Sequence, residues 1–200
     1  MHERGEQPGL TIVRLDPRGR WVVIDKPAGL LSVPGKGADK QDCAAGRVRA
    51  AFSHAAGPLV VHRLDMDTSG LLLLGLDAEA QRKLSRQFEQ REVEKAYIAL
   101  VEGVPPGEAG VIVAPMRLDI DRRPYQIVDW AQGKPARTQW AVTAIEADRT
   151  RLKLWPLTGR THQLRVHCAH IGHPIVGDVL YGSGVEGHGR LMLHAAELVF

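Results

Sequence analysis

The stretch Val61-His62-Arg63-Leu64-Asp65-Met66-Asp67-Thr68-Ser69-Gly70 connects a turn-forming segment to an apolar run. Thr, Ser and Gly bond or bend the local backbone, so we expect residues 68–70 to form a turn from which Leu71-Leu72-Leu73-Leu74 enters a buried strand. This arrangement predicts that Asp65 lies on a loop at the edge of that strand. An Arg-x-Asp pattern in a turn is more often a structural ion pair than a catalytic group, so this stretch alone leaves both interpretations open.

The rest of the chain predicts a mostly β protein with a few helices. A buried strand over residues 21–25 ends where Pro27 and Gly29 favour a turn, and Asp77 is a candidate N-cap for a helix that places Leu84 and Phe88 on one face. Residues 163–171 read as a short helix closed by Gly172. Further strands are expected at 95–101, 110–114, 138–145, 151–155 and 191–199. We therefore predict an α+β fold: a mostly antiparallel mixed sheet with flanking helices and a central cleft.

Length and composition suit one compact domain. The 200 residues are 44% hydrophobic, enough to bury a sizeable core, and we assign residues 13–200 to a single domain that follows a polar tail at 1–12. The polar connection at 119–135 is the best candidate for a substrate-facing loop. The first residues lack the apolar segment of a signal peptide, and no apolar run reaches the ~20 residues of a membrane helix. These features predict a cytoplasmic protein that does not insert into a membrane.

Charge and cysteine usage add two weaker indications. The net charge is only +3, but the pI near 9.0 and the excess of arginine over lysine favour a phosphate-bearing or polyanionic partner. Arg82, Lys83 and Arg86 lie on the predicted helix, where a solvated charged face is the ordinary interpretation and phosphate contact the alternative. Cys43 and Cys168 are expected to be free thiols, since they form no disulfide framework and no Cys-x-x-Cys pair.

Several motifs together resemble one enzyme family. They are His62-Arg63-Leu64-Asp65 with Thr68-Ser69-Gly70, then Lys95-x-Tyr97, then residues 159–167, and then Gly172-His173-Pro174-Ile175-x-Gly177-Asp178. In order and spacing they resemble the RluA-type pseudouridine synthases, from about Trp21 to Phe200. The chain is similar to the short members, which lack an N-terminal RNA-binding module, and most of all to the dual-specificity type that modifies ribosomal RNA and tRNA. Family members usually continue beyond the position of Phe200, so we expect a further edge strand to be missing.

The resemblance implies the pseudouridine synthase catalytic fold and a specific use of the aspartate. Such enzymes break the N1–C1′ bond of a uridine, rotate the uracil and rejoin it through C5, without a cofactor. By resemblance, Asp65 is the nucleophile and Arg165 keeps it ionised through a charge pair. Tyr97 is expected to stack on the uracil or to assist proton transfer at C5. Whether Asp65 attacks the sugar or the base, or assists glycal formation, stays open.

Other residues receive supporting roles from the same comparison of motifs. Arg63 is expected to fill the space left by the flipped base, and His62 and Arg160 to contact RNA, although His62 also suits a role in orienting the loop. Lys26 and Leu164 are expected to shape the pocket. Asp67 and Asp178 are interpreted as structural carboxylates. The imidazoles and thiol near residues 167–173 lack the ligand spacing of a zinc site, so no metal is expected.

The predicted partner is structured RNA: large-subunit ribosomal RNA, a tRNA anticodon stem-loop, or both. The protein is expected to act as a monomer. Two other functions remain possible from the residues. One is a catalytically inactive RNA-binding or chaperone module with the same fold. The other is a carboxylate-dependent glycoside or nucleoside hydrolase, which requires a second acid that no motif supplies.

Overall fold

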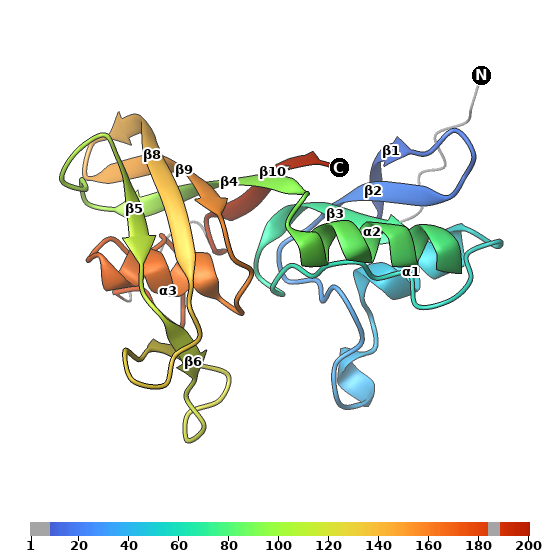
Figure 1. The fold of residues 1–200 in the computed structure, drawn as a ribbon, viewed down its shortest axis with the longest axis horizontal. Coiled ribbons are helices and arrows are strands. Elements are labelled where there is room, and N and C mark those ends of the chain that lie inside the picture. Colours follow the sequence, from blue (N-terminus) through green and yellow to red (C-terminus); the bar gives the residue numbers. More distant parts are fainter. Residues whose placement is uncertain (1–8, 184–188) are drawn as a thin grey trace. The chain divides into compact units, whose positions relative to one another are not determined.

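The computed structural model describes residues 9–183 and 189–200, so positions 1–8 of the predicted polar tail lie outside the described residues. The chain divides into two compact units (Figure 1). The first contains the chain up to Glu94 together with Glu197–Phe200, and the second contains Lys95–Ala196.

Three antiparallel strands and three helical segments build the first unit. The strands are β1 (Thr11–Leu15), β2 (Trp21–Lys26) and β3 (Ser69–Gly75), in the order β1-β2-β3. The helical segments are the 3₁₀ turn η1 (Ala38–Lys40), α1 (Ala44–Ala51) and α2 (Ala78–Gln90). Strand β1 carries a bulge between Ile12 and Arg14.

The core of the first unit forms where the two apolar strands meet the apolar face of α2. Val23 of β2 and Leu73 of β3 are buried against Leu84 of α2, and Phe88 packs on the same cluster one turn later. The spacing of four residues places Leu84 and Phe88 on one side of the helix, as the sequence predicted. At Gly75 a Cβ would lie 2.6 Å from the Cα of Gln81, so the close approach of α2 to the end of β3 requires glycine.

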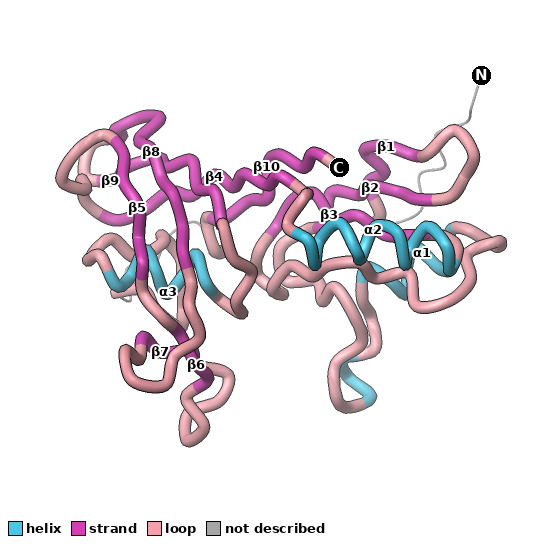
Figure 2. Tube along the Cα trace, in the orientation of Figure 1, coloured by secondary structure: helices cyan, strands magenta, loops and turns pink. Residues whose placement is uncertain are grey.

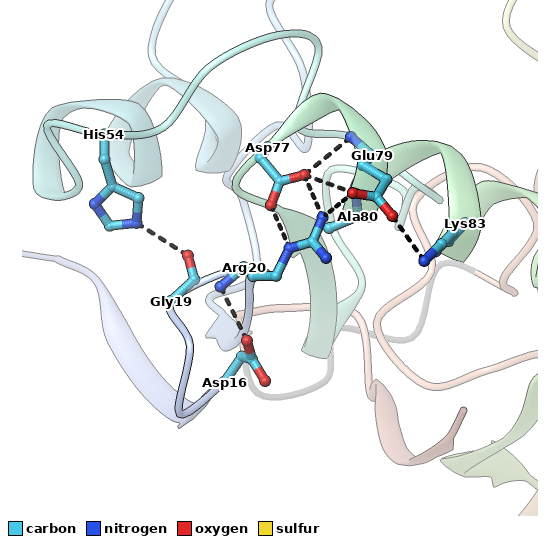
Figure 3. A network of polar contacts seen from close by, with 8 residues as sticks. All are labelled: Asp16, Gly19, Arg20, His54, Asp77, Glu79, Ala80 and Lys83. Carbon is cyan, nitrogen blue, oxygen red and sulfur yellow. Dashed lines mark hydrogen bonds and ion pairs between the residues drawn. The ribbon is translucent and has the colours of Figure 1, made fainter.

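Helix α2 begins in a network of polar contacts (Figure 3). Asp77 is its N-cap, and one carboxylate oxygen accepts hydrogen bonds from the N–H groups of Glu79 and Ala80, at 2.9 Å each. The guanidinium of Arg20 donates to both carboxylate oxygens of Asp77, at 2.8 and 2.9 Å, and also to Glu79. The Arg20 guanidinium holds the pKa of the Asp77 carboxyl far below its usual range. The predicted N-cap is therefore confirmed.

Five strands of a mostly antiparallel sheet form the second unit. Its strands follow the order β10-β4-β9-β8-β5, and β6 pairs with β7 in a separate hairpin (Figure 2). The strands are β4 (Glu94–Glu102), β5 (Ala109–Val113), β6 (Met116–Leu118), β7 (Gln126–Val128), β8 (Arg137–Glu146), β9 (Arg149–Pro156) and β10 (Leu193–Val199). The helix of this unit is α3 (Gln163–His170).

One apolar cluster packs α3 against the sheet of the second unit. Leu164 and Cys168 of α3 lie in the same buried cluster as Leu152 and Leu154 of β9, together with Trp140 of β8. Leu164 and Cys168 are one helical turn apart, so they share a face. This packing fixes the helix that carries Arg165.

The α+β class and the mostly antiparallel pairing are confirmed, and every predicted strand and helix is present with small shifts at its ends. The elements that were not predicted are β1, the short η1, α1 and the β6–β7 hairpin. Strand β1 includes Thr11 and Ile12, which the sequence had placed in the tail, and β7 lies inside the connection predicted at 119–135. No helix among the described residues is both long and apolar enough to span a membrane.

Candidate active site

The loop that carries Asp65 precedes β3 in the first unit. Its turn spans residues 65–68 and therefore lies earlier than the turn predicted at 68–70. The N–H of Thr68 donates to the carbonyl of Asp65 at 3.1 Å, and Ser69 and Gly70 already belong to β3. The side chain of Asp65 is half-buried, whereas Thr68 is buried. Asp65 therefore begins a tight turn whose far end is fixed in the sheet.

Buried polar groups hold the backbone on both sides of Asp65. On one side, the hydroxyl of Ser32 donates to the carbonyl of Leu64 at 2.7 Å and accepts the N–H of Leu64 at 3.1 Å. On the other side, the carbonyl of Met66 accepts the N–H of Gly29 at 2.9 Å and the ammonium of Lys26 at 2.9 Å. The backbone next to the carboxylate is thus fastened at both neighbouring residues.

Lys26 is fully buried at the end of β2 and binds three backbone carbonyls. Its Nζ donates to Pro27 at 2.9 Å, to Leu30 at 2.7 Å and to Met66 at 2.9 Å. Burial lowers the pKa of Lys26 to about 8, while the charges of Asp67 and Asp65 oppose that shift. The amine was predicted to shape a pocket, and it holds the Asp65 loop to the turn after β2.

His62 and Arg63 precede Asp65 and have different surroundings. The Nε2 atom of His62 accepts the N–H of Leu73 at 3.0 Å, and its ring stacks on Phe88 of α2 with centroids 4.4 Å apart. These contacts anchor the start of the loop to the strand and to the helix. Arg63 is exposed. The predicted RNA contacts of both residues stay predictions.

Tyr97 lies on β4 of the second unit, opposite Leu154 of β9. The tyrosine is half-buried and packs against the main apolar cluster of this unit. Lys95 lies two residues earlier on the same side of the strand, and burial lowers the pKa of its amine. Both residues of the Lys-x-Tyr motif are therefore held by a central strand rather than by a loop.

Arg165 lies in α3 and forms a buried ion pair with Asp178. Its Nε donates to Oδ2 at 2.8 Å and its Nη2 to Oδ1 at 2.6 Å, and the two side chains are 2% and 0% exposed. Asp178 was interpreted as a structural carboxylate, and this fork-to-fork contact fixes the orientation of the guanidinium. The predicted pairing of Arg165 with Asp65 joins residues of different units and stays a prediction.

Tyr181 supports the same arginine, and no role was predicted for it from the sequence. The guanidinium carbon of Arg165 lies 5.2 Å from the centre of the Tyr181 ring. The hydroxyl of Tyr181 is 2.7 Å from Nδ1 of His162 and accepts the N–H of Gln126 in β7 at 2.8 Å. The ring therefore connects Arg165, the residue before α3 and the β6–β7 hairpin. Its position three residues after Asp178 in the Gly177-Asp178 motif was the signal available in the sequence.

Arg160 and Leu164 flank the start of α3. The Nε of Arg160 donates to the carbonyl of Pro135 at 3.2 Å, and its N–H donates to Oε1 of Gln163 at 3.0 Å. Gln163 also binds the carbonyl of Arg137, at 3.0 Å. Leu164 is buried in the apolar cluster of the second unit. The roles predicted for Arg160 in RNA binding and for Leu164 in shaping a pocket stay predictions.

Two of the residues that raised the zinc alternative, His167 and Cys168, are buried in α3. The two ring nitrogens of buried His167 lie 2.9 Å from Oγ1 of Thr138 and 3.1 Å from the carbonyl of Ala114. Burial lowers the pKa of His167 and raises the pKa of the Cys168 thiol to about 12. Both cysteines are buried free thiols, as predicted. These side chains serve the packing of α3.

The predicted residues thus fall into two groups. The structure brings Lys26, His62, Arg63 and Asp65 together around one loop of the first unit. It places Arg160, Leu164 and Arg165 on and just before α3 of the second unit, where Tyr97 lies on β4. A carboxylate on a loop whose backbone is held, a fixed guanidinium and a strand-held tyrosine are groups suited to nucleophilic chemistry with proton transfer.

Comparisons with known proteins agree with this chemistry. Residues 20–170 match the family model described as RNA pseudouridylate synthase. The chain is 43% identical over 197 residues to the dual-specificity RNA pseudouridine synthase RluA of Escherichia coli (strain K12), covering 96% of this chain and 87% of that protein. It is 44% identical to the enzyme of the same name from Pasteurella multocida (strain Pm70), over 96% of this chain and 87% of that protein.

Solved structures give the same result for the fold. The human RNA pseudouridylate synthase domain containing 1 matches with a TM-score of 0.78 and 34% identity, over 98% of this chain and 80% of that one. The human RNA pseudouridylate synthase domain containing 4 matches with a TM-score of 0.74 and 27% identity, over 94% of this chain and 83% of that one. The chain belongs to the RNA pseudouridylate synthase family, whose members are isomerases that convert uridine in RNA to pseudouridine.

Proposed function

We propose that this isomerase uses Asp65 as the nucleophile that converts a uridine of structured RNA to pseudouridine. The fastening of Leu64 and Met66 on either side of Asp65 is the observation that supports the proposal most strongly. A nucleophile must be held close to its productive position, because small displacements cost large factors in rate. A surface carboxylate without a catalytic role does not require a buried serine and a buried lysine to hold the backbone of the residues on either side of it.

The reaction balances without any added oxidant, reductant or leaving group. The N1–C1′ bond of the uridine breaks and a C5–C1′ bond forms, while C5 loses a proton and N1 gains one. Asp65 bonds transiently to the reacting nucleotide, at the sugar or at the base, and this bond breaks again before pseudouridine is released, so that the carboxylate is regenerated. Tyr97 contacts the uracil ring and assists the transfer of the C5 proton.

Arg165 is proposed to pair with the Asp65 carboxylate and keep it ionised. Support comes from its fixed orientation, because Asp178 engages Nε and Nη2 and thereby sets the plane of the guanidinium. A guanidinium stays charged at any physiological pH and binds carboxylates in a planar fork. Lys26 adds a second positive charge that interacts with Asp65.

The proposed substrate is a stem-loop, either of large-subunit ribosomal RNA, of the anticodon arm of tRNA, or of both. The bacterial relatives named above are called dual-specificity RNA pseudouridine synthases, which supports more than one RNA target. Arg63 is exposed beside the nucleophile and is proposed to occupy the space of the flipped base, with His62 and Arg160 contacting the RNA. We further propose that the protein acts as a monomer in the cytoplasm.

A mapping experiment identifies the substrate. Purified protein is incubated with total RNA from a strain that lacks its own copy of the gene, and pseudouridine is mapped by carbodiimide adduct sequencing. New sites with the wild type, absent with Asp65→Asn, are expected. RNA binding without new sites would support the inactive-module alternative, and free uracil in the supernatant would support the hydrolase alternative.

A further inference from the structure

Trp130 is a large aromatic side chain exposed at the surface of the second unit. Its exposed fraction is 70%, whereas Trp140 in the same unit is 7% exposed. Trp130 belongs to the turn of residues 129–133, which follows β7 and precedes β8, and which we call the Trp130 turn. Exposure of so much apolar surface is unfavourable in water, so the position of this side chain calls for a physical reason.

The Trp130 turn is held by a dense set of hydrogen bonds. Oδ1 of Asp129 accepts the N–H groups of Ala131 and Gln132, at 2.9 Å each, and Oδ2 forms an ion pair with Nε of Arg117 at 2.5 Å. The carbonyl of Asp129 accepts the N–H of Gly133 at 2.9 Å. One carboxylate therefore closes the turn directly around Trp130.

The same turn is fastened at its base to the start of β6. The N–H of Asp129 donates to the carbonyl of Pro115 at 2.9 Å, and Met116 and Lys134 exchange two backbone hydrogen bonds of 2.9 and 2.8 Å. At Gly133 a Cβ would lie 2.3 Å from the carbonyl oxygen of Asp129 and 2.7 Å from the carbonyl carbon of Pro115, so only glycine allows this packing. Trp130 is thus exposed on a rigid support.

A preformed aromatic surface binds a planar partner at low entropic cost, because the backbone that carries it is already ordered. Two basic residues are close to the residues that follow the turn. Lys134 is exposed directly after the turn, and Arg160 donates to the carbonyl of Pro135. An exposed aromatic ring combined with lysine and arginine is the combination by which proteins bind single-stranded nucleic acid: a base stacks on the ring and the cations hold the phosphates.

We propose that the Trp130 turn is a stacking site for an unpaired base of the substrate RNA, with Lys134 and Arg160 binding the adjacent phosphates. This inference rests on the proposed function and assigns to that function a recognition surface separate from the reacting groups. Unpaired loop bases expose the faces that stack on aromatic side chains, whereas bases inside a helix do not. The Trp130 turn therefore selects RNA with an unpaired loop over fully paired RNA.

The test measures RNA binding without turnover. Trp130→Ala, Trp130→Phe and the matched control Ile145→Ala, another exposed apolar residue of the second unit, are each made in the Asp65→Asn background. The probes are a fluorescein-labelled stem-loop and a duplex made of its stem alone. The stem-loop comes from the transcript that the wild type modifies, or is a tRNA anticodon stem-loop if none is modified. Affinities are read by fluorescence anisotropy at one fixed salt concentration, because phosphate contacts depend strongly on salt.

Trp130→Ala is expected to weaken stem-loop binding about 10- to 100-fold, Trp130→Phe only a few-fold, and Ile145→Ala not at all. Duplex binding is expected to be the same for all three. Unchanged stem-loop affinity of Trp130→Ala would overturn the proposal, as would an equal loss for stem-loop and duplex. A change in molar mass by light scattering without a change in RNA affinity would also overturn it, since it would show that Trp130 contacts a second copy of the chain.

The failure of this proposal can be told apart from the failure of the proposed function. If the wild type forms pseudouridine and Trp130→Ala does so with an unchanged KM, only the stacking site is refuted. If the wild type forms no pseudouridine, the proposed function fails, and the anisotropy measurement still decides whether Trp130 stacks on RNA. If the stacking site is real, Trp130→Ala raises KM and leaves kcat close to the wild-type value.

Discussion

The guanidinium of Arg165 and the carboxylate of Asp178 form a buried, two-pronged ion pair, with donor–acceptor distances of 2.8 and 2.6 Å. The same carboxylate accepts the backbone N–H groups of Leu180 and Tyr181, at 2.9 and 3.1 Å. Asp178 therefore fixes the arginine and the turn that carries Tyr181 at the same time. The orientation of the arginine is set by this carboxylate before any RNA binds.

Asp178→Asn is expected to lower the free energy of unfolding by about 3–5 kcal/mol, because it leaves a buried cation without this partner. Urea unfolding measures the loss. The double variant Arg165→Met with Asp178→Asn is the control, and it should be more stable than Asp178→Asn alone because the buried charge is gone. A fully additive loss in the double variant would contradict this account of the pair.

Tyr181→Phe keeps the ring beside Arg165 and removes only the hydroxyl that binds Gln126 and His162. We expect a modest loss of stability, about 1–2 kcal/mol, and a small decrease in kcat. Tyr181→Leu also removes the ring and should reduce kcat further, with KM little changed, because the arginine loses a support on one side. Urea unfolding measures the loss of stability, and steady-state kinetics over a range of RNA concentrations measures kcat and KM. Equal rates for Tyr181→Phe and Tyr181→Leu would refute the proposal that the Tyr181 ring helps to position Arg165.

Because the amine of Lys26 is buried, we predict that the stability of the protein depends on pH. Burial lowers the pKa of this amine from its usual 10.5 to about 8, so between these two values the unfolded chain binds more protons than the folded one. Stability should therefore rise with pH through this window, by at most roughly 3 kcal/mol for this group. The cost of burying the charge is fully present below pH 8 and is relieved toward pH 10.5.

Unfolding by urea at several pH values measures this slope for the wild type, for Lys26→Met and for Lys40→Met, an exposed lysine of η1 as the control. Lys26→Met should lack the rise, and Lys40→Met should keep it. The loop of Asp65 should loosen in Lys26→Met, since the carbonyls of Pro27, Leu30 and Met66 lose their donor. Identical slopes in all three proteins would show that the amine titrates normally.

Asp77 offers a test that separates stability from activity. Asp77→Ala removes the N-cap of α2 and should cost about 0.5–2 kcal/mol of stability, with kcat unchanged at a temperature where the variant is folded. Asp77→Asn keeps a capping side chain but loses the ion pair with Arg20, so its loss should be smaller. Thermal unfolding and the rate of pseudouridine formation are measured side by side. A loss of kcat in a fully folded Asp77 variant would contradict the purely structural role of this network.

Much of the fold could be predicted because its signals are local. The run Leu71–Leu74 indicates a buried strand, and Asp77 before an apolar stripe indicates a helix start. Strand β1 escaped prediction because most of its side chains are exposed and a bulge breaks its alternation. The hairpin of β6 and β7 consists of strands too short to show a period.

The site was predictable only in part. The Asp65 motif identifies the loop. The hydrogen bonds from Ser32 to Leu64 and from Lys26 to Met66 join residues more than thirty positions apart, and no spacing in the sequence reveals them. Tyr181 was missed for the same reason, since its partners come from β7 and from the start of α3. Trp130 lies within the polar connection predicted at 119–135, but only the folded turn shows that its side chain is exposed.

The most direct test of the central claim is the rate of pseudouridine formation under single-turnover conditions for the wild type, Asp65→Asn and Asp67→Asn. Asp67 is the matched control, because it is a half-buried carboxylate of the same loop two residues away. We predict that Asp65→Asn binds the RNA and forms no pseudouridine, while Asp67→Asn remains active. Pseudouridine formation by Asp65→Asn at a rate close to that of the wild type would contradict the assignment of the nucleophile.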